Sequence, residues 1–235
     1  MYEYKSVLRD LPDRPISGVL GPDVKEMPMT SLTRQPVEDL IKDVAISAYD
    51  AMEDAIALAT TANLHMALEG AQSCQSIACR ARKIMIAALK RRLFSSQNCI
   101  NVGLGHAEDA RLFANAASIF ARYAAQRIAA PTKPDAEKAT AESMGLMLAA
   151  IRVLVAAIKT ECTRDAMKKA ATAVTRGTGL PEEAAKAGDP CARDASAAVT
   201  ITKEINVRVR WLGMHGERKA MLHVSNLRQP TSVSA

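Results

Sequence analysis

Histidine and carboxylate side chains are the first residues of this chain to consider for chemistry, and their spacing defines no complete site. His65 and Glu69 are four residues apart, so on a helix they share a face and could bind one metal ion. No second such pair and no Glu-x-x-His sequence completes a carboxylate site within a helical bundle. Together with Glu53 they are the only candidates for a cofactor-binding bundle, and we predict neither a metal nor a cofactor.

The cysteines are odd in number and scattered, which predicts free thiols in a reducing, intracellular compartment. Cys74 and Cys79 are five residues apart, a spacing unlike that of a zinc site, and on a helix they would point in different directions. We expect each to be a small core residue. The five cysteines are Cys74, Cys79, Cys99, Cys162 and Cys191.

Two further stretches contain residue types that occur in catalytic or ligand-binding sites. The segment GLGHAED, residues 103–109, has two glycines but lacks the third glycine of a dinucleotide fingerprint and the Lys-Ser/Thr of a P-loop. It predicts a loop and a helix start near His106. His215 and His223, with Glu217 between them, favour a solvated or interface role. Since no nucleophile elbow or paired-carboxylate motif is present, we predict that the protein is not an enzyme.

The elements that would position these residues are predicted to be long α-helices. Hydrophobic residues make up 49% of the 235 residues but aromatic residues only 3%, a composition that favours closely packed helices. Apolar residues recur every three or four positions from Val37 to about residue 95, which indicates one very long helix or two helices that meet near Gly70. Further helices are expected at about 106–129 and 135–175. Residues 37–198 are therefore predicted to form a helical bundle.

The longest apolar run, residues 144–158, predicts a buried core helix. It is about 15 residues long, shorter than the roughly 20 that a bilayer span needs, and Arg152 lies at its middle. The charged, proline-interrupted start of the chain does not resemble a signal peptide. We therefore expect no membrane span and a location in the cytoplasm or, for a coat protein, in the virion.

The two ends of the chain are predicted to differ from the bundle. Residues 1–36 hold five of the ten prolines and show no apolar period, which predicts an extended arm. Residues 199–211, VTITKEINVRVRW, alternate apolar and polar side chains, which predicts a β-strand. Residues 199–235 are accordingly expected to form a β-hairpin and a polar tail. The apolar face of the strand, expected to pair with a neighbouring subunit, consists of Val199, Ile201, Ile205, Val207, Val209 and Trp211.

Charge is segregated along the chain, whose net charge is +6. Residues 37–69 carry one lysine and seven acidic residues, whereas residues 70–107 carry six basic residues and no acidic one. Three interpretations remain open: a solvated helix face, pairing of acidic and basic halves between subunits, and binding of nucleic acid. The basic residues expected to contact nucleic acid or an acidic partner are Arg80, Arg82, Lys83, Lys90, Arg91, Arg92, Arg208 and Arg210.

These patterns predict a mainly α protein: a helical bundle with an extended N-terminal arm and a C-terminal β-hairpin. A helical body with terminal arms exchanged between copies indicates a self-assembling structural subunit, such as a viral coat, nucleocapsid or filament protein. Its partners would be copies of itself and, through the basic segments, nucleic acid. The alternatives are a nucleic-acid-binding or regulatory helical oligomer and, third, an enzyme or cofactor-binding bundle.

Overall fold

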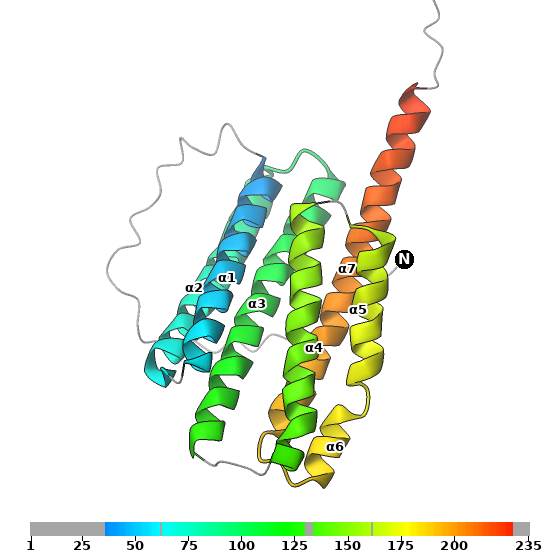
Figure 1. Ribbon diagram of the computed structural model, residues 1–235. Helices are drawn as coiled ribbons and strands as arrows, with labels where there is room; N and C mark the ends of the chain where they lie inside the picture. The colour runs from blue at the N-terminus through cyan, green and yellow to red at the C-terminus, as the bar shows by residue number, and fades with distance from the viewer. Residues whose placement is uncertain (1–35, 62, 130–133, 161, 228–235) are drawn as a thin grey trace, which may run out of the picture. The chain divides into compact units, whose positions relative to one another are not determined.

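The computed structural model describes residues 36–61, 63–129, 134–160 and 162–227, with side chains described as far as His215. Seven helices and no strand occur in this part of the chain (Figure 1). The predicted arm, residues 1–36, lies outside it except for Pro36, as do the last eight residues. The helices are α1 (Val37–Thr60), α2 (Leu64–Lys90), α3 (Gln97–Ala129), α4 (Pro134–Lys159), α5 (Arg164–Gly177), α6 (Leu180–Lys186) and α7 (Ala192–Leu227).

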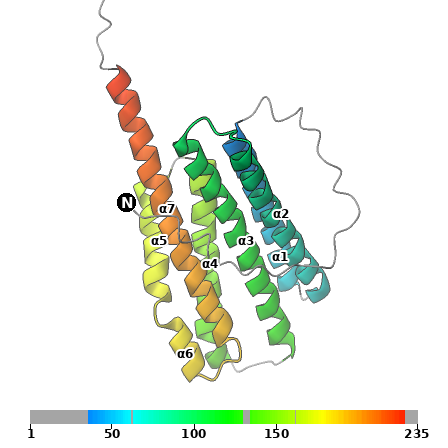
Figure 2. The ribbon, with the colours of Figure 1, turned by 180° about the vertical axis from the view of Figure 1, so that it is seen from behind.

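The helices pack as two groups that meet chiefly along α3 and α7. Helices α1, α2 and α3 pack against one another, and α4 packs against α5, α6 and α7. Contacts between the groups are mostly those of α3 with α7, which lie side by side when the molecule is viewed from behind (Figure 2). The largest fully buried side chains include Phe113 in the first group and Met147 and Ile205 in the second. We call the contact between α3 and α7 the seam.

The predicted C-terminal β-hairpin is wrong, because residues 199–211 lie within helix α7. Their burial follows the helical period and not the period of two: Thr202 and Arg208, expected on the polar face, are buried, whereas Val207 is 65% exposed. The buried positions fall three or four apart, as on one face of a helix. Alternation of β-branched residues is therefore an incidental feature here, and tertiary packing outweighs their modest preference for strands.

Helices α1 and α2 replace the single long helix that the sequence left open, and they meet at residues 61–63 rather than at Gly70. Gly70 lies inside α2, where an added Cβ would be 3.0 Å from the Cβ of Ala55 on α1. The glycine thus lets the two backbones approach closely. Nearby, the Cys74 thiol donates a hydrogen bond to the carbonyl oxygen of Ala48 at 3.0 Å.

Two other helix boundaries differ from the sequence expectations. Helix α3 already begins at Gln97, so the predicted loop before His106 is helical. The helix expected at 135–175 is divided into α4 and α5, and the Thr163 side chain caps α5 by accepting a hydrogen bond from the Ala166 N–H. By length and composition α4 is apolar enough to cross a membrane, but 56% of its most apolar stretch is buried inside the structure, as in a core helix.

Candidate functional site

The basic residues predicted between positions 80 and 92 lie on the exposed side of α2 and in the turn after it. Arg92 adopts a left-handed backbone conformation with φ of 54°, which terminates the helical hydrogen bonding just after Lys90. The buried side of α2 carries small residues and Met85, so the long basic side chains occupy the opposite side. All six are exposed: Arg80, Arg82, Lys83, Lys90, Arg91 and Arg92.

Large apolar side chains are exposed on the same helix. Of the eight large hydrophobic residues that are exposed in the described structure, four lie on α2 and a fifth, Leu93, follows it. Ile86 and Leu89 are three residues apart on α2, so they lie on the same side of the helix beside the lysines, and Leu93 follows the turn after it. A contiguous exposed apolar patch marks an interaction site, which makes the end of α2 a candidate for a contact. The five are Met66, Leu68, Ile86, Leu89 and Leu93.

Helix α1 has an outer stripe of the opposite charge. Asp39, Asp43, Asp50 and Asp54 are all exposed, and their spacing of four, seven and four residues places them on one side of the helix. The buried stripe of α1, which includes Met52, faces the other way. We call the exposed sides of α1 and α2 together the outer face. The outer face therefore has an acidic stripe on α1 and basic and apolar side chains on α2.

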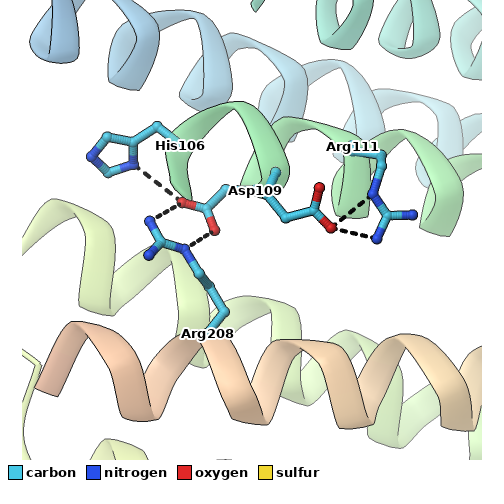
Figure 3. A network of polar contacts seen from close by, with 5 residues as sticks. His106, Asp109, Arg111 and Arg208 are labelled. Atoms are coloured by element: carbon cyan, nitrogen blue, oxygen red, sulfur yellow. Dashed lines mark hydrogen bonds and ion pairs between the residues drawn. The ribbon is translucent and has the colours of Figure 1, made fainter. Parts of the chain in front are cut away.

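Arg208, which the sequence assigned to nucleic acid or an acidic partner, is instead buried at the seam. Its Nε lies 2.7 Å and its Nη2 3.0 Å from the two carboxylate oxygens of Asp109 on α3 (Figure 3). His106 Nδ1 lies 3.1 Å from Asp109 Oδ2, a contact in which the imidazole N–H donates. Although burial alone would raise the pKa of Asp109, Arg208 and His106 hold that pKa below its ordinary value.

The Asp109–Arg208 pair is one of a series of ion pairs that follow the seam. Arg111 Nη2 lies 2.6 Å from Glu204 Oε2 and 2.5 Å from Glu108 Oε1. As the α3 position increases, the partner's position decreases, so the two helices run antiparallel. The further pairs are Arg122 with Asp194 at 3.1 Å and Arg127 with Asp189 at 2.7 Å.

Asp189 precedes α7 and is held by three donors. Its carboxylate accepts hydrogen bonds from the Thr140 hydroxyl, the Arg127 guanidinium and the Cys191 backbone N–H. Burial would raise the pKa of Asp189, but these hydrogen bonds outweigh burial and lower the pKa. The carboxylate thereby fixes the start of α7 against α3 and α4.

The residues predicted to form an inter-subunit strand are divided among the core, the seam and the exposed side of α7. Trp211 is half-buried: the Arg208 guanidinium carbon lies 4.4 Å from the centre of its ring, and the His215 ring stacks on it with centroids 4.1 Å apart. His215 in turn hydrogen-bonds Asn98 at the start of α3. Arg210 is exposed on α7, and Val207 is also exposed. The buried remainder is Val199, Ile201, Ile205 and Val209.

The candidate metal ligands do not converge. His65 Nδ1 lies 3.6 Å from Glu69 Oε1, with both side chains largely exposed. No group of three His, Cys, Asp or Glu side chains able to hold a metal ion occurs among the described residues. Cys74 is buried, which raises the pKa of its thiol to about 12 and makes it unreactive at neutral pH.

Sequence reasoning missed Asp109 and misread Gly105, the two residues that make the buried pair possible. A Cβ at position 105 would lie 2.3 Å from Nη2 of Arg208, so the guanidinium occupies the space that the glycine leaves open. The sequence feature that could have indicated this buried pair is the segment 103–109 itself. Its glycines lie inside α3 and leave room for neighbouring side chains.

Comparison with protein-family models, with curated proteins and with solved structures finds no match.

Proposed function

We infer that the protein is a structural subunit that associates with copies of itself through the outer face of α1 and α2. The observation that supports this most is the exposed apolar group at the end of α2, where Ile86 is 42%, Leu89 39% and Leu93 45% exposed. Removal of apolar area from water contributes about 25 cal/mol per Å², so several such side chains favour association when another surface covers them. The terminal strand that the sequence suggested for this role is helical, so the contact is assigned to helices instead.

A contact made by only a few apolar side chains is weak between two copies alone. Association costs at least about 4 kcal/mol in lost translational and rotational freedom, before the ordering of side chains. A subunit that makes the same contact repeatedly in a larger assembly overcomes this cost through the number of contacts. We therefore expect assembly that depends on protein concentration.

Size-exclusion chromatography with light scattering, together with negative-stain electron microscopy, tests the proposal. We expect defined particles larger than a monomer at roughly tens of micromolar protein, the range where contacts of about −6 to −7 kcal/mol become populated. A triple variant, Ile86→Gln, Leu89→Gln and Leu93→Gln, should remain monomeric and folded. Ile128→Gln is the matched control, because Ile128 is 52% exposed but lies on α3. A wild-type protein that stays monomeric overturns the proposal.

Binding of nucleic acid is the second candidate function, supported by the exposure of the basic side chains on α2. Phosphate contacts by such residues make affinity fall steeply with salt. Lys83→Gln combined with Lys90→Gln should then reduce the slope of log affinity against log salt by roughly two. An unchanged slope rejects this role for α2. Arg208 takes no part in it, because its guanidinium is committed to Asp109.

A further inference from the structure

We propose that the contact between copies joins unlike surfaces: the acidic stripe of α1 in one copy binds the basic and apolar side of α2 in the other. This inference rests on the proposed self-association and specifies which two surfaces meet. It commits the exposed side of α2 to one occupant, a second copy of this chain. The residues that carry it are Asp50 and Asp54 on α1 and Lys83 and Lys90 on α2.

The first argument is that these charges are too far apart to neutralise one another within one copy. The Cys74–Ala48 hydrogen bond fixes where α1 and α2 lie side by side, and the Gly70–Ala55 contact shows that they run antiparallel. Lys83 and Lys90 follow Cys74 by roughly 14 and 24 Å along α2, at 1.5 Å per residue. Asp50 and Asp54 lie beyond Ala48 in the opposite direction.

That separation exceeds the Debye length of about 8 Å at physiological ionic strength, so the exposed charges are screened from one another. Asp50, Asp54, Lys83 and Lys90 make no ion pair with any residue that the structure describes. Asp50 and Asp54 on α1, like Lys83 and Lys90 on α2, are therefore left for a partner. Each copy carries both members of a complementary pair of surfaces.

The second argument concerns symmetric alternatives. A two-fold contact of α2 with α2 would bring the basic stripes of both copies together, and a contact of α1 with α1 would do the same for the aspartates. Like charges in juxtaposition oppose both arrangements. Pairing α1 with the α2 of another copy satisfies Asp50 and Asp54 as well as Lys83 and Lys90. Used in both directions between two copies, this pairing closes an isologous dimer, and used in one direction it gives a ring or an open filament.

The third argument is steric. The acidic stripe of α1 also contains Ser47 and Ala57, both small and exposed, so a neighbouring helix can approach closely there. Ile86 and Leu89 lie beside the lysines on α2 and would be covered by that approach. Charge then sets the register of the contact, while the apolar side chains supply the burial.

Charge reversal on each surface tests the proposal. The first variant is Asp50→Lys with Asp54→Lys, and the second is Lys83→Glu with Lys90→Glu. Controls with the same changes in charge are Glu182→Lys with Glu183→Lys on α6, and Lys168→Glu with Lys186→Glu on α5 and α6, all at exposed positions. Circular dichroism and thermal unfolding verify that each variant is folded, and sedimentation velocity measures its assembly.

We expect each outer-face variant alone to assemble at least about tenfold more weakly than the wild type, which corresponds to roughly 1.4 kcal/mol. An equimolar mixture of the two should recover assembly, because the acidic α2 of one then meets the basic α1 of the other. Weakening in only one variant, or no recovery in the mixture, overturns the pairing of α1 with α2 between copies. If the wild type assembles and neither variant is weakened, this inference fails while self-association stands. A wild type that never assembles overturns both.

Discussion

The seam between α3 and α7 and the outer face of α1 and α2 use charge in opposite ways. At the seam, Arg208 is 7% exposed and meets two carboxylate oxygens of Asp109, so its charge is compensated inside the molecule. On the outer face, Lys83 and Lys90 are exposed and lie on the side of α2 that faces away from α1 and α3. A positively charged side chain therefore stabilises the fold at the seam, whereas on the outer face positively charged side chains remain available to a partner.

This difference gives each region a distinct response to substitution. A charge whose partner is buried cannot be rehydrated when that partner is removed, so the cost falls on folding. An exposed charge stays in water whether or not a partner is present, so its loss falls on association. The experiments below measure folding and association separately for both regions.

The largest effect is expected from Asp109→Ala at the seam. This change leaves the buried Arg208 guanidinium without its carboxylate, which should lower the free energy of unfolding by about 3–5 kcal/mol in chemical denaturation. The double variant Asp109→Leu with Arg208→Met removes both charges and should recover most of that loss. Arg82→Met on the outer face is the control and should change stability by less than about 0.5 kcal/mol. A loss below about 1 kcal/mol for Asp109→Ala would contradict a structural role for the pair.

The next largest effect on the seam is expected from acidification. It should lower the free energy of unfolding by less than Asp109→Ala does, because a protonated carboxyl still fills its site. The pKa values of Asp109 and Asp189 are lower in the folded state than the ordinary value of about 3.9. Their contribution to stability is thus fully present above that pH and is lost as the pH falls through the folded-state values. Urea denaturation between about pH 7 and pH 2 measures this. In the Asp109→Leu, Arg208→Met variant the free energy of unfolding should fall less steeply with decreasing pH than in the wild type. An equally steep fall would show that Asp109 does not contribute.

Gly105→Ala should also destabilise the seam, by about 1–3 kcal/mol, because the added methyl displaces the Arg208 guanidinium from Asp109. Gly145→Ala is the matched control. Its Cβ would meet no atom within 4 Å, so the higher helix propensity of alanine should raise stability by about 0.5–1 kcal/mol. Thermal unfolding of the two variants measures the contrast. Stabilisation by both would mean that the guanidinium moves aside at no cost.

The sequence predicted the helical body but not the seam, and the reason is physical. Apolar spacing reports which side of a helix is buried, and it located the buried stripe of α1 well. On α2 it was less accurate, since Leu89 is exposed. Ion pairs such as Asp109 with Arg208 join residues 99 positions apart, and no local pattern distinguishes a buried arginine from an exposed one. The misreading of residues 199–211 has the same origin. The alternation predicts a strand, but Ile201, Ile205 and Val209 are four residues apart and also share one side of a helix. Packing against α3 and α4 selects the helix.

The outer face shows the reverse case, where sequence alone already indicated charge segregation but left its meaning open. The acidic run of residues 37–69 and the basic run of 70–107 could have paired with each other inside one molecule. The antiparallel packing of α1 and α2 instead places Asp54 and Lys90 toward opposite ends of the helix pair. Three-dimensional placement, and not composition, distinguishes internal compensation from a surface that can bind another copy.

The smallest effect on folding is expected from Lys83→Gln combined with Lys90→Gln on the outer face, within about 0.5 kcal/mol of the wild type. Both side chains are exposed, so their neutral replacements stay hydrated in the monomer. Trp211, the only tryptophan, reports on the seam by fluorescence, since it stacks on Arg208 and His215. Its emission should be unchanged in this variant and shifted to longer wavelength in Asp109→Ala. Sedimentation velocity should show weaker assembly for the lysine variant at the same time. A lysine variant that unfolds more easily, or that shifts the Trp211 emission, would mean that the outer face and the seam are not independent.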